Sequence, residues 1–434
     1  MLISLAMIVK NEEAMLAHCL ESVRALVDEM IIVDTGSTDK TIDIANSFGA
    51  QVHHFEWRDD FSAARNESLK FCRGDWVLIL DADEAIDALD YEKIKNACLY
   101  PQADAYNLIH RHYLITPATI SLDAPATANA SNYSEGKGLP FYADNPCLRL
   151  SKMFDGLAFQ HKIHETIGVS IESSGRKIEN LDAVVHHYGK LDDEREEYKS
   201  QYYFMLAKKE ADANPGYIPA QFNLLAQALM AKQWWLALSA AMASLKLTSD
   251  VDPLVFYGAG AALQSLGRHR ESIDYFDMLL RQHPKHALGM SGKGDSCWAL
   301  GNISDARELM TKAIELQPGS ATFHKRLAEL EYDAKNLDAS RKAALDAIAL
   351  APNEPSLYDL LLKIEMTRDN HQQAAQDALL GIRRCPMGGE GRWHRLAAVY
   401  LCQENQPGTA RSIVELGLKC FPGEPGLVRL KGMI

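Results

Sequence analysis

The stretch Trp76-Val77-Leu78-Ile79-Leu80-Asp81-Ala82-Asp83-Glu84 decides the fold of the first half of this 434-residue chain. A run of apolar residues followed by a cluster of acids predicts a buried strand of a parallel sheet, with the acids at its carboxyl end. Two carboxylates one residue apart can hold one divalent cation, which in turn binds phosphate oxygens. The alternative is that Asp83 and Glu84 only begin the next helix, where acidic side chains suit the positive end of the helix dipole.

Three further apolar runs precede this strand, and helical patterns lie between them. These runs are Leu2–Val9, Met30–Val33 and Val52–Phe55. Alternating strands and helices predict an α/β domain with a largely parallel sheet. Ligands of such sheets bind at the carboxyl ends of the strands, where the polar loops at residues 10–12 and 34–39 would join the acids. This setting favours a binding role for the acidic cluster.

The residues after about 215 follow a different period. Prolines at positions 284, 318, 352 and 386 are spaced 34 residues apart, and small side chains recur in register with them. One column of small residues is Ser272, Ala306, Ser340, Ala374 and Ala410. A second column, small in most repeats, is Leu279, Ala313, Ala347, Gly381 and Gly417. This period predicts an all-α solenoid of helix–turn–helix repeats, with a further unit near Tyr217–Ser249.

The two patterns divide the chain into three parts. Residues 1–190 form the predicted α/β domain, residues 191–215 a connecting helix, and residues 216–434 the helical repeats. The small, polar stretch from Thr116 to Asp144 is long for a loop in a compact domain, and we expect it to be a lid over the site.

Charge and cysteine usage exclude some classes of protein. The net charge is −13, and because nucleic-acid binding needs a basic surface, a nucleic-acid partner is not expected. The eight cysteines include no CxxC pair, which indicates reduced thiols. No apolar run approaches the length of about 18 residues that a membrane span needs, and Met1 leads straight into an apolar segment without signal-peptide features. We therefore expect a cytoplasmic protein without a transmembrane segment.

Three motifs together resemble a known family. Ile8-Val9-Lys10-Asn11-Glu12, the segment 32–39 and Leu80-Asp81-Ala82-Asp83-Glu84 resemble, in order and spacing, family 2 glycosyltransferases of the GT-A fold, over roughly residues 1–190. The C-terminal repeats resemble tetratricopeptide repeats. Phe61–Asn66 and Ile163-His164-Glu165 are typical of a subgroup with such repeats, which includes peptide S-glycosyltransferases of glycocin biosynthesis. The resemblance implies a Rossmann-like, mostly parallel α/β GT-A domain followed by an all-α tetratricopeptide-repeat solenoid.

The resemblance assigns the nucleoside end of a sugar-nucleotide donor to the first two loops. Val9, Asn11 and Glu12 would border the nucleoside, and Asp34 would hydrogen-bond the base, which we expect to be uracil. Many relatives carry a second Asp where this chain has Thr35. The alternative for Asp34 is a role in turn formation, to which Asp is well suited.

The resemblance also implies a divalent metal, Mn²⁺ or Mg²⁺. Asp83 would be the principal ligand, and Asp81 and Ala82 would lie near the ribose or the metal. His187, at the end of the domain, would complete the metal shell or touch the diphosphate, with His186 as the alternative.

Arg65 would reach the diphosphate as a charged donor, with Asp60 orienting its side chain. The alternative is an exposed Asp60–Arg65 pair, which would contribute little.

The reaction implied by the family needs a base for the acceptor. Glu165 is our candidate, with His164 orienting it or binding the acceptor. Asp144 and Asp155 are weaker candidates for the base.

The function implied is an inverting transfer of a sugar from a nucleoside-diphosphate donor, a UDP-sugar, to a protein or peptide held by the repeats. Two alternatives stay open: a polysaccharide or lipid-linked acceptor, and a catalytically inactive domain within an interaction scaffold. Self-association of the chain into a homo-oligomer through the repeats is a further possibility.

Overall fold

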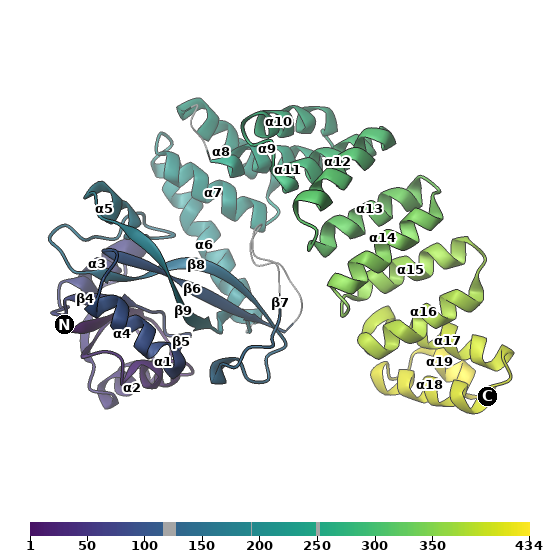
Figure 1. Ribbon diagram of the computed structural model, residues 1–434, viewed down its shortest axis with the longest axis horizontal. Helices are drawn as coiled ribbons and strands as arrows, with labels where there is room; N and C mark the ends of the chain where they lie inside the picture. Colours follow the sequence, from purple (N-terminus) through teal and green to yellow (C-terminus); the bar gives the residue numbers. More distant parts are fainter. Residues whose placement is uncertain (116–126, 192, 249–251) are drawn as a thin grey trace. The chain divides into compact units, whose positions relative to one another are not determined.

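The computed structural model describes residues 1–115, 127–191, 193–248 and 252–434 (Figure 1). The chain forms two compact units, Met1–Ser249 and Asp250–Ile434. The first unit contains a sheet and the second is helical.

The first unit is built around one sheet and the helices that cover it. Its strands are β1 (Ile3–Val9), β2 (Glu29–Asp34), β3 (Gln51–His54), β4 (Trp76–Ile79), β5 (Glu84–Ile86), β6 (Ala105–Leu114), β7 (Thr127–Ala128), β8 (Phe141–Lys152) and β9 (Ile178–His187). Its α-helices are α1 (Leu16–Val23), α2 (Thr41–Ser47), α3 (Phe61–Leu69), α4 (Tyr91–Leu99), α5 (Gly168–Ser173), α6 (Asp193–Ala213), α7 (Ile218–Met230) and α8 (Trp234–Leu247). The short 3₁₀ helices are η1 (Ala88–Asp90), η2 (Ser134–Gly136) and η3 (Gly189–Leu191).

Among the described residues, the strands form one sheet in the order β3-β2-β1-β4-β8-β6-β9-β5, with β7 on β8. The first four strands are parallel, as expected. The second half is mixed, because β8 runs antiparallel to both β4 and β6. The expectation of a mostly parallel sheet is therefore right for β1–β4 and for the β6–β9 pair, but not for the pairs of β8 or for β5 with β9. The sequence is consistent with this difference: β6 and β8 contain several polar and charged side chains, whereas β1 and β4 are almost wholly apolar runs, as in parallel sheets.

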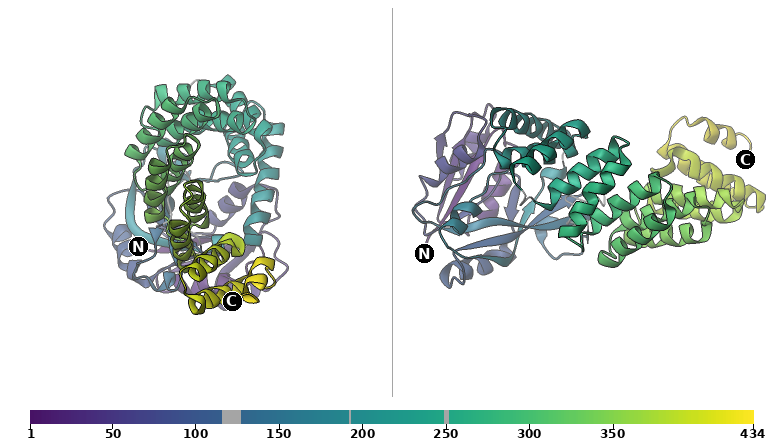
Figure 2. Two further views of the ribbon diagram at one scale, coloured as in Figure 1. Left: turned by 90° about the vertical axis from the view of Figure 1, so that its right-hand side faces the viewer. Right: turned by 90° about the horizontal axis from the view of Figure 1, so that it is seen from above.

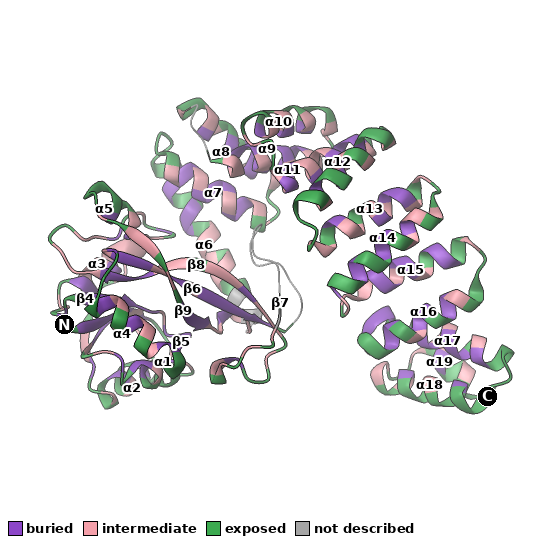
Figure 3. Ribbon diagram, in the orientation of Figure 1, coloured by how far each residue is buried: buried purple, intermediate pink, exposed green. Residues whose placement is uncertain are grey.

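Strands β1 and β4 are buried on both faces (Figure 3). On one face, Met7 and Leu78 belong to the same core cluster as Leu20 of α1. On the other face, Ile79 clusters with Leu69 of α3. Burying both faces leaves the strand ends as the place where polar side chains gather, and this edge carries the site.

The predicted lid lies partly outside the described residues, which exclude 116–126. At its far end, Phe141–Asp144 is not loop but the start of β8, which pairs with β6 and β7. Between them, Asn129 N donates to Pro140 O at 2.9 Å, and Asn129 Nδ2 donates to Gly136 O at 2.8 Å. The loop prediction was thus wrong for the last residues of the segment, and the role as a lid stays a prediction.

Helix α6 lies where a helix is predicted after the sheet domain, and the pair α7 and α8 coincides with the predicted early repeat unit. All three helices belong to the first compact unit, which extends to Ser249. Among the described residues, none of the helices combines the length and apolar character of a membrane span.

The second unit consists of helix pairs that stack side by side (Figures 1 and 2). Its α-helices are α9 (Pro253–Ser265), α10 (His269–Gln282), α11 (Ala287–Ala299), α12 (Ile303–Leu316), α13 (Ala321–Asp333), α14 (Leu337–Leu350), α15 (Pro355–Thr367), α16 (His371–Arg384), α17 (Arg392–Gln403), α18 (Pro407–Cys420) and α19 (Pro425–Lys431). A 3₁₀ turn, η4 (Gly388–Gly391), precedes α17. Every residue of the two predicted columns is buried, which confirms the 34-residue repeat.

Close helix crossing explains the small residues. A Cβ added to Gly260 of α9 would lie 2.8 Å from the ring of Phe276 of α10. One repeat later, a Cβ on Gly294 would lie 3.3 Å from Met310 Cγ. The large side chain thus packs 16 residues after the glycine in both repeats, and the glycine leaves the space that it needs.

Replacing Phe276, which is fully buried, should destabilise the second unit. We expect Phe276→Ala to cost about 3–5 kcal/mol, the usual effect of removing a buried aromatic side chain. Urea unfolding of the full chain, followed by circular dichroism, measures the change. The control is Met278→Ala on the same helix, where Met278 is 40% exposed. Equal midpoints for the two variants would contradict this packing.

Candidate active site

The loops after β1 and β2 are locked to each other. Asn11 has φ of 55°, and its side-chain oxygen accepts a hydrogen bond from Thr38 N at 2.8 Å. The Asp34 carboxylate accepts hydrogen bonds from Gly36 N at 3.0 Å and Ser37 N at 3.1 Å. The carboxylate that we expected to bind the base therefore forms its own turn, and it is buried.

Glu12 and Val9 border the same loops. Val9 is buried at the end of β1 and accepts a hydrogen bond from Thr35 N at 3.0 Å. Glu12 Oε1 lies 2.5 Å from Arg195 of α6. Burial raises the pKa of Glu12, and Arg195 opposes this effect. The residues predicted for the nucleoside thus lie together, and α6 supplies a cation beside them.

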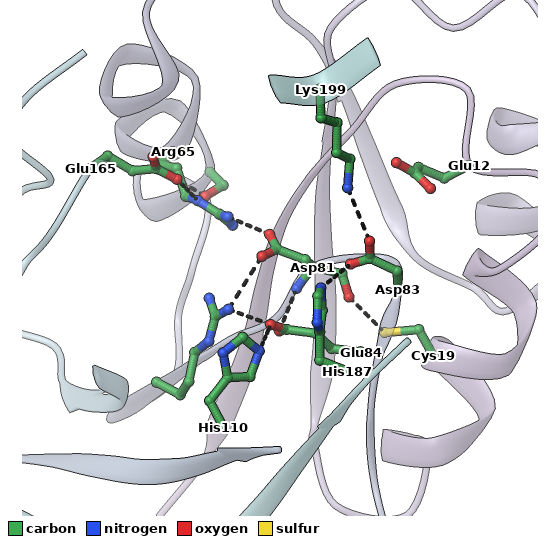
Figure 4. Close-up of polar contacts among 12 residues, drawn as sticks. Glu12, Cys19, Arg65, Asp81, Asp83, Glu84, His110, Glu165, His187 and Lys199 are labelled. Atoms are coloured by element: carbon green, nitrogen blue, oxygen red, sulfur yellow. Dashed lines mark hydrogen bonds and ion pairs between the residues drawn. The ribbon is translucent and has the colours of Figure 1, made fainter. Parts of the chain in front are cut away.

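Asp81 is held between two arginines (Figure 4). Its Oδ1 pairs with Arg65 of α3, and its Oδ2 lies 3.2 Å from Arg149 of β8. Desolvation alone would raise the pKa of Asp81, but Arg65 and Arg149 outweigh it and hold that pKa well below its usual range. The Asp81 side chain is 37% exposed, whereas Arg65 and Arg149 are buried.

The predicted Asp60–Arg65 pair was wrong. The Asp60 carboxylate accepts hydrogen bonds from Ala63 N at 2.9 Å and Ser62 Oγ at 2.7 Å, and so caps α3. Arg65 instead bridges Asp81 and another carboxylate, because residues five apart on a helix point in different directions.

Asp83 faces a different set of partners. Its Oδ2 lies 3.1 Å from Lys199 Nζ and 3.7 Å from Arg195, both on α6. Its Oδ1 lies 3.8 Å from Nε2 of His187, at the end of β9. Burial would raise the pKa of Asp83, but His187 and Lys199 lower it overall. Asp83 thus stays ionised next to an imidazole and two cations.

Gly189 leaves a space between Asp83 and His187. A Cβ added at this glycine would lie 2.7 Å from Asp83 Oδ2 and 2.7 Å from His187 Nε2. Carboxylate oxygen and imidazole nitrogen are the ligand types that first-row divalent metals accept. The residues present therefore fit a divalent ion at this point, in agreement with the ligand types predicted for Asp83 and His187.

Two further histidines surround His187. His110 and His112 lie on β6 next to β9, and one nitrogen of each of these three rings lies within 4.8 Å of the others. Burial lowers the pKa of His110 to about 3 and that of His112 to about 2, and it lowers the pKa of His187 as well. The sequence signal was available in the alternation of His110 and His112, which places both on one face of a strand.

Glu84, the last acid of the motif, points inward. It pairs with Arg149, and its Oε1 lies 2.6 Å from His110 Nε2. Burial raises the pKa of Glu84 to about 7, against the opposing effect of Arg149. It does not begin a helix, since β5 starts at this residue and pairs with β9.

The predicted base lies in a loop that helices hold in place. Glu165 Oε1 accepts a hydrogen bond from Arg65 Nε at 3.0 Å, so it shares this arginine with Asp81. His164 has φ of 55°, and its Nε2 lies 3.1 Å from Gln227 Nε2 of α7. Burial lowers the pKa of His164. His164 therefore anchors the loop to α7. Among the described residues, the structure shows no hydrogen bond between His164 and Glu165.

Comparison with known proteins finds matches to two parts of the chain. Residues 4–130 match the family described as glycosyl transferase family 2, and residues 257–321 and 291–355 match the tetratricopeptide repeat. An uncharacterized glycosyltransferase of Rickettsia typhi is 27% identical over 238 residues, which cover 54% of this chain and 74% of that protein. The glycosyltransferase SunS of a Bacillus subtilis prophage is 35% identical over 83 residues, covering 19% of this chain and 20% of SunS.

Two further matches are to proteins described as containing TPR repeats. A TPR repeat-containing protein of Synechococcus elongatus is 44% identical over 107 residues, and the match spans 25% of this chain and only 27% of that protein. Among solved structures, the C-terminal part of a TPR repeat-containing protein from Cytophaga hutchinsonii covers 54% of this chain and 95% of its own, with 14% identity and a TM-score of 0.44.

The matched residues 4–130 include β2, β3, β4 and the acidic motif at the end of β4. The chain carries a glycosyltransferase family 2 domain at its N-terminus, and tetratricopeptide repeats follow it.

Removing the arginine shared by Asp81 and Glu165 should destabilise the first unit. We expect Arg65→Met to cost about 3 kcal/mol, because it leaves a largely buried carboxylate without its charge partner. Urea unfolding measures the loss. The control is Arg58→Met: Arg58 is 70% exposed and pairs with Glu56 at 3.7 Å, so its loss should cost no more than about 1 kcal/mol. A stability of Arg65→Met equal to that of the control would show that the bridge does not stabilise the domain.

Proposed function

We propose that the chain is a metal-dependent, inverting glycosyltransferase that moves a sugar from a UDP-sugar to a peptide or protein acceptor. The space that Gly189 leaves between Asp83 and His187 carries the donor half of this proposal. Cations line the same place, since Lys199 and Arg195 both reach Asp83 Oδ2. A site that combines cationic side chains with metal-binding groups is suited to anionic phosphate oxygens.

In this mechanism, Asp83 and His187 hold the divalent ion, Mn²⁺ or Mg²⁺. When bound there, the ion supplies positive charge for the departing nucleoside diphosphate. Lys199 and Arg195 bind the diphosphate oxygens, and their contacts with Asp83 hold them in position before the donor arrives. Asp81 lies beside this site, and each of its oxygens contacts an arginine. In this proposal its main role is therefore to position Arg65 and Arg149, and not to bind the metal.

Glu165 is the proposed base. Its contact with Arg65 keeps the carboxylate fixed. It takes the proton of the acceptor nucleophile as that atom attacks the anomeric carbon from the face opposite the diphosphate, which inverts the configuration. Asp144 fits less well as the base, because its carboxylate forms two hydrogen bonds with Arg111, of 2.8 and 2.6 Å.

The repeats support a polypeptide acceptor. The second unit holds a groove of about 330 Å³ on α11, α13 and α15. Its lining combines the aromatic side chains of Trp298 and Tyr332 with carboxylates that include Asp333 and Asp359. Aromatic anchors in a groove with charged groups at the rim are typical of peptide-binding surfaces. The similarity to SunS, a glycosyltransferase, is consistent with the transfer reaction.

Donor binding should stabilise the protein only when a metal is present. We expect a UDP-sugar with Mn²⁺ to raise the free energy of unfolding by about 2.7 kcal/mol at a hundred times its Kd. Thermal unfolding against a panel of nucleotide sugars measures it. Asp83→Ala should abolish the effect. Gly189→Ala should weaken it by filling the space at the ligands, whereas the control Gly216→Ala has open space around the added Cβ and should behave like the natural chain. If no sugar nucleotide stabilises the protein, the proposed donor site is wrong.

The acceptor half has a separate test. Incubation with a UDP-sugar, Mn²⁺ and basic peptides should add one sugar mass to a peptide, read by mass spectrometry. Asp333→Lys in the groove should raise the KM for the peptide about fivefold, as expected for losing an exposed charge contact worth ~1 kcal/mol, while donor hydrolysis is unchanged. The control Asp346→Lys changes another exposed acid, on α14. Transfer to a lipid-linked or polysaccharide acceptor and not to peptides would favour the alternative acceptor.

A further inference from the structure

A chain of contacts leads from β8 to the proposed metal ligand. Asn145 Oδ1 lies 2.7 Å from His112 Nε2, and His112 Nδ1 lies 2.9 Å from His187 Nδ1. The other nitrogen of His187, Nε2, faces Asp83 Oδ1 at 3.8 Å. Three strands, β8, β6 and β9, thus contribute one side chain each to a line that ends at the acidic motif.

The direction of these hydrogen bonds follows from their first member. A carbonyl oxygen only accepts, so His112 donates from Nε2 to Asn145 Oδ1. The orientation of the amide is supported at its other end, where Asn145 Nδ2 lies 3.5 Å from Pro146 O. With its proton on Nε2, a neutral His112 has a lone pair at Nδ1. It therefore accepts a hydrogen bond from His187 Nδ1.

His187 then has its lone pair on Nε2. Both rings are largely buried, which disfavours a second proton on either. The Nε2 lone pair faces Asp83 Oδ1 at 3.8 Å, so two acceptors lie opposite each other. A cation next to both side chains would satisfy them, and a Cβ on Gly189 would lie 2.7 Å from His187 Nε2 and 2.7 Å from the other carboxylate oxygen, Asp83 Oδ2.

We propose that Asn145 and His112 are positioning residues that fix the proton of His187 on Nδ1 and so present Nε2 to a divalent metal. The proposal rests on the metal site between Asp83 and His187 proposed above. Metal-binding histidines commonly donate their second nitrogen to a neighbour that fixes the ring and its tautomer. Here another imidazole, itself held by an amide, takes the place of the usual carboxylate or backbone carbonyl.

His110 provides a matched comparison. It lies two residues before His112 on the same strand, is equally buried, and its ring centroid lies 5.0 Å from that of His187. However, its Nε2 faces Glu84, and no hydrogen bond that the structure shows connects it to His187. Changing His110 therefore removes a buried neighbouring imidazole without interrupting the line from Asn145.

The experiment reads the tautomer of His187 in the metal-free, full-length chain. Nitrogen-15 histidine NMR distinguishes a proton on Nδ1 from one on Nε2, and His187→Gln assigns the signal. We expect Nδ1–H in the natural chain and in His110→Phe. His112→Phe removes the acceptor, so the proton should move to Nε2, next to Asp83. His112→Asn places an amide where Nδ1 was and should restore Nδ1–H.

Calorimetric titration with MnCl₂ gives the second readout. We expect His112→Phe to bind Mn²⁺ about 10–100-fold more weakly, the usual effect of losing such a neighbour, with His112→Asn and His110→Phe within about threefold of the natural chain. Thermal unfolding in EDTA checks that the variants are folded. If His112→Phe is not, Asn145→Leu tests the same line from its other end and should also shift the tautomer.

Any of the following results would overturn the proposal: Nε2–H on His187 in the natural metal-free chain, an unchanged tautomer in His112→Phe, or an Mn²⁺ affinity of that variant equal to that of the natural chain. A loss in His110→Phe as large as in His112→Phe would also overturn it, since the three rings would then act together as ligands. If the natural chain binds no Mn²⁺, the metal site of the proposed function fails, and the tautomer measurement still decides whether His112 controls His187.

Discussion

The contacts of Arg65 and Arg149 with the Asp81 carboxylate hold together the edge of the sheet that carries the candidate site. These two arginines also reach Glu165 and Glu84, so that α3, β8, the end of β4, the start of β5 and the loop at Glu165 meet around them. Burying charge is costly unless opposite charges are paired closely. Two largely buried cations against three carboxylates nearly balance, and the Asp81 side chain is the member of the network that stays partly exposed.

This network separates the two acids of the motif. Asp81 has an arginine at each oxygen, and both arginines are fixed by further carboxylates. Asp83 has partners of another kind. Two of them, Lys199 and Arg195, are long side chains from α6, and the third is the imidazole of His187. An ion or a phosphate group can replace the partners of Asp83 at low cost, whereas replacing those of Asp81 would leave buried charge unpaired. Two carboxylates that look equivalent in the sequence therefore differ in what they are free to bind.

The sequence predicts what depends on local pattern. Apolar runs ending in polar residues locate β1, β2 and β4 and the loops that follow them, and the 34-residue period locates the repeats and their buried columns. It does not predict contacts between distant segments: Arg149 lies 68 residues after Asp81, and Lys199 lies 116 residues after Asp83. Where spacing alone suggested a pair, as for Asp60 and Arg65, helix geometry overrode it. The sequence places His110 and His112 on one face of a strand, but it does not predict that this strand, β6, pairs with β9 and so brings both rings next to His187.

Helices α6 and α7 connect the two halves of the proposed reaction within the first unit. Lys199 and Arg195 of α6 face the donor side, at Asp83, while Gln227 and Asn223 of α7 contact His164 and the backbone of Ile163, beside the proposed base. In the proposed function, the leaving-group contacts and the base therefore depend on two consecutive helices C-terminal to the sheet. This explains in physical terms why the first compact unit does not end with β9 but continues to Ser249. A domain cut after the last strand would lack the cations at Asp83 and the support of the loop that carries Glu165.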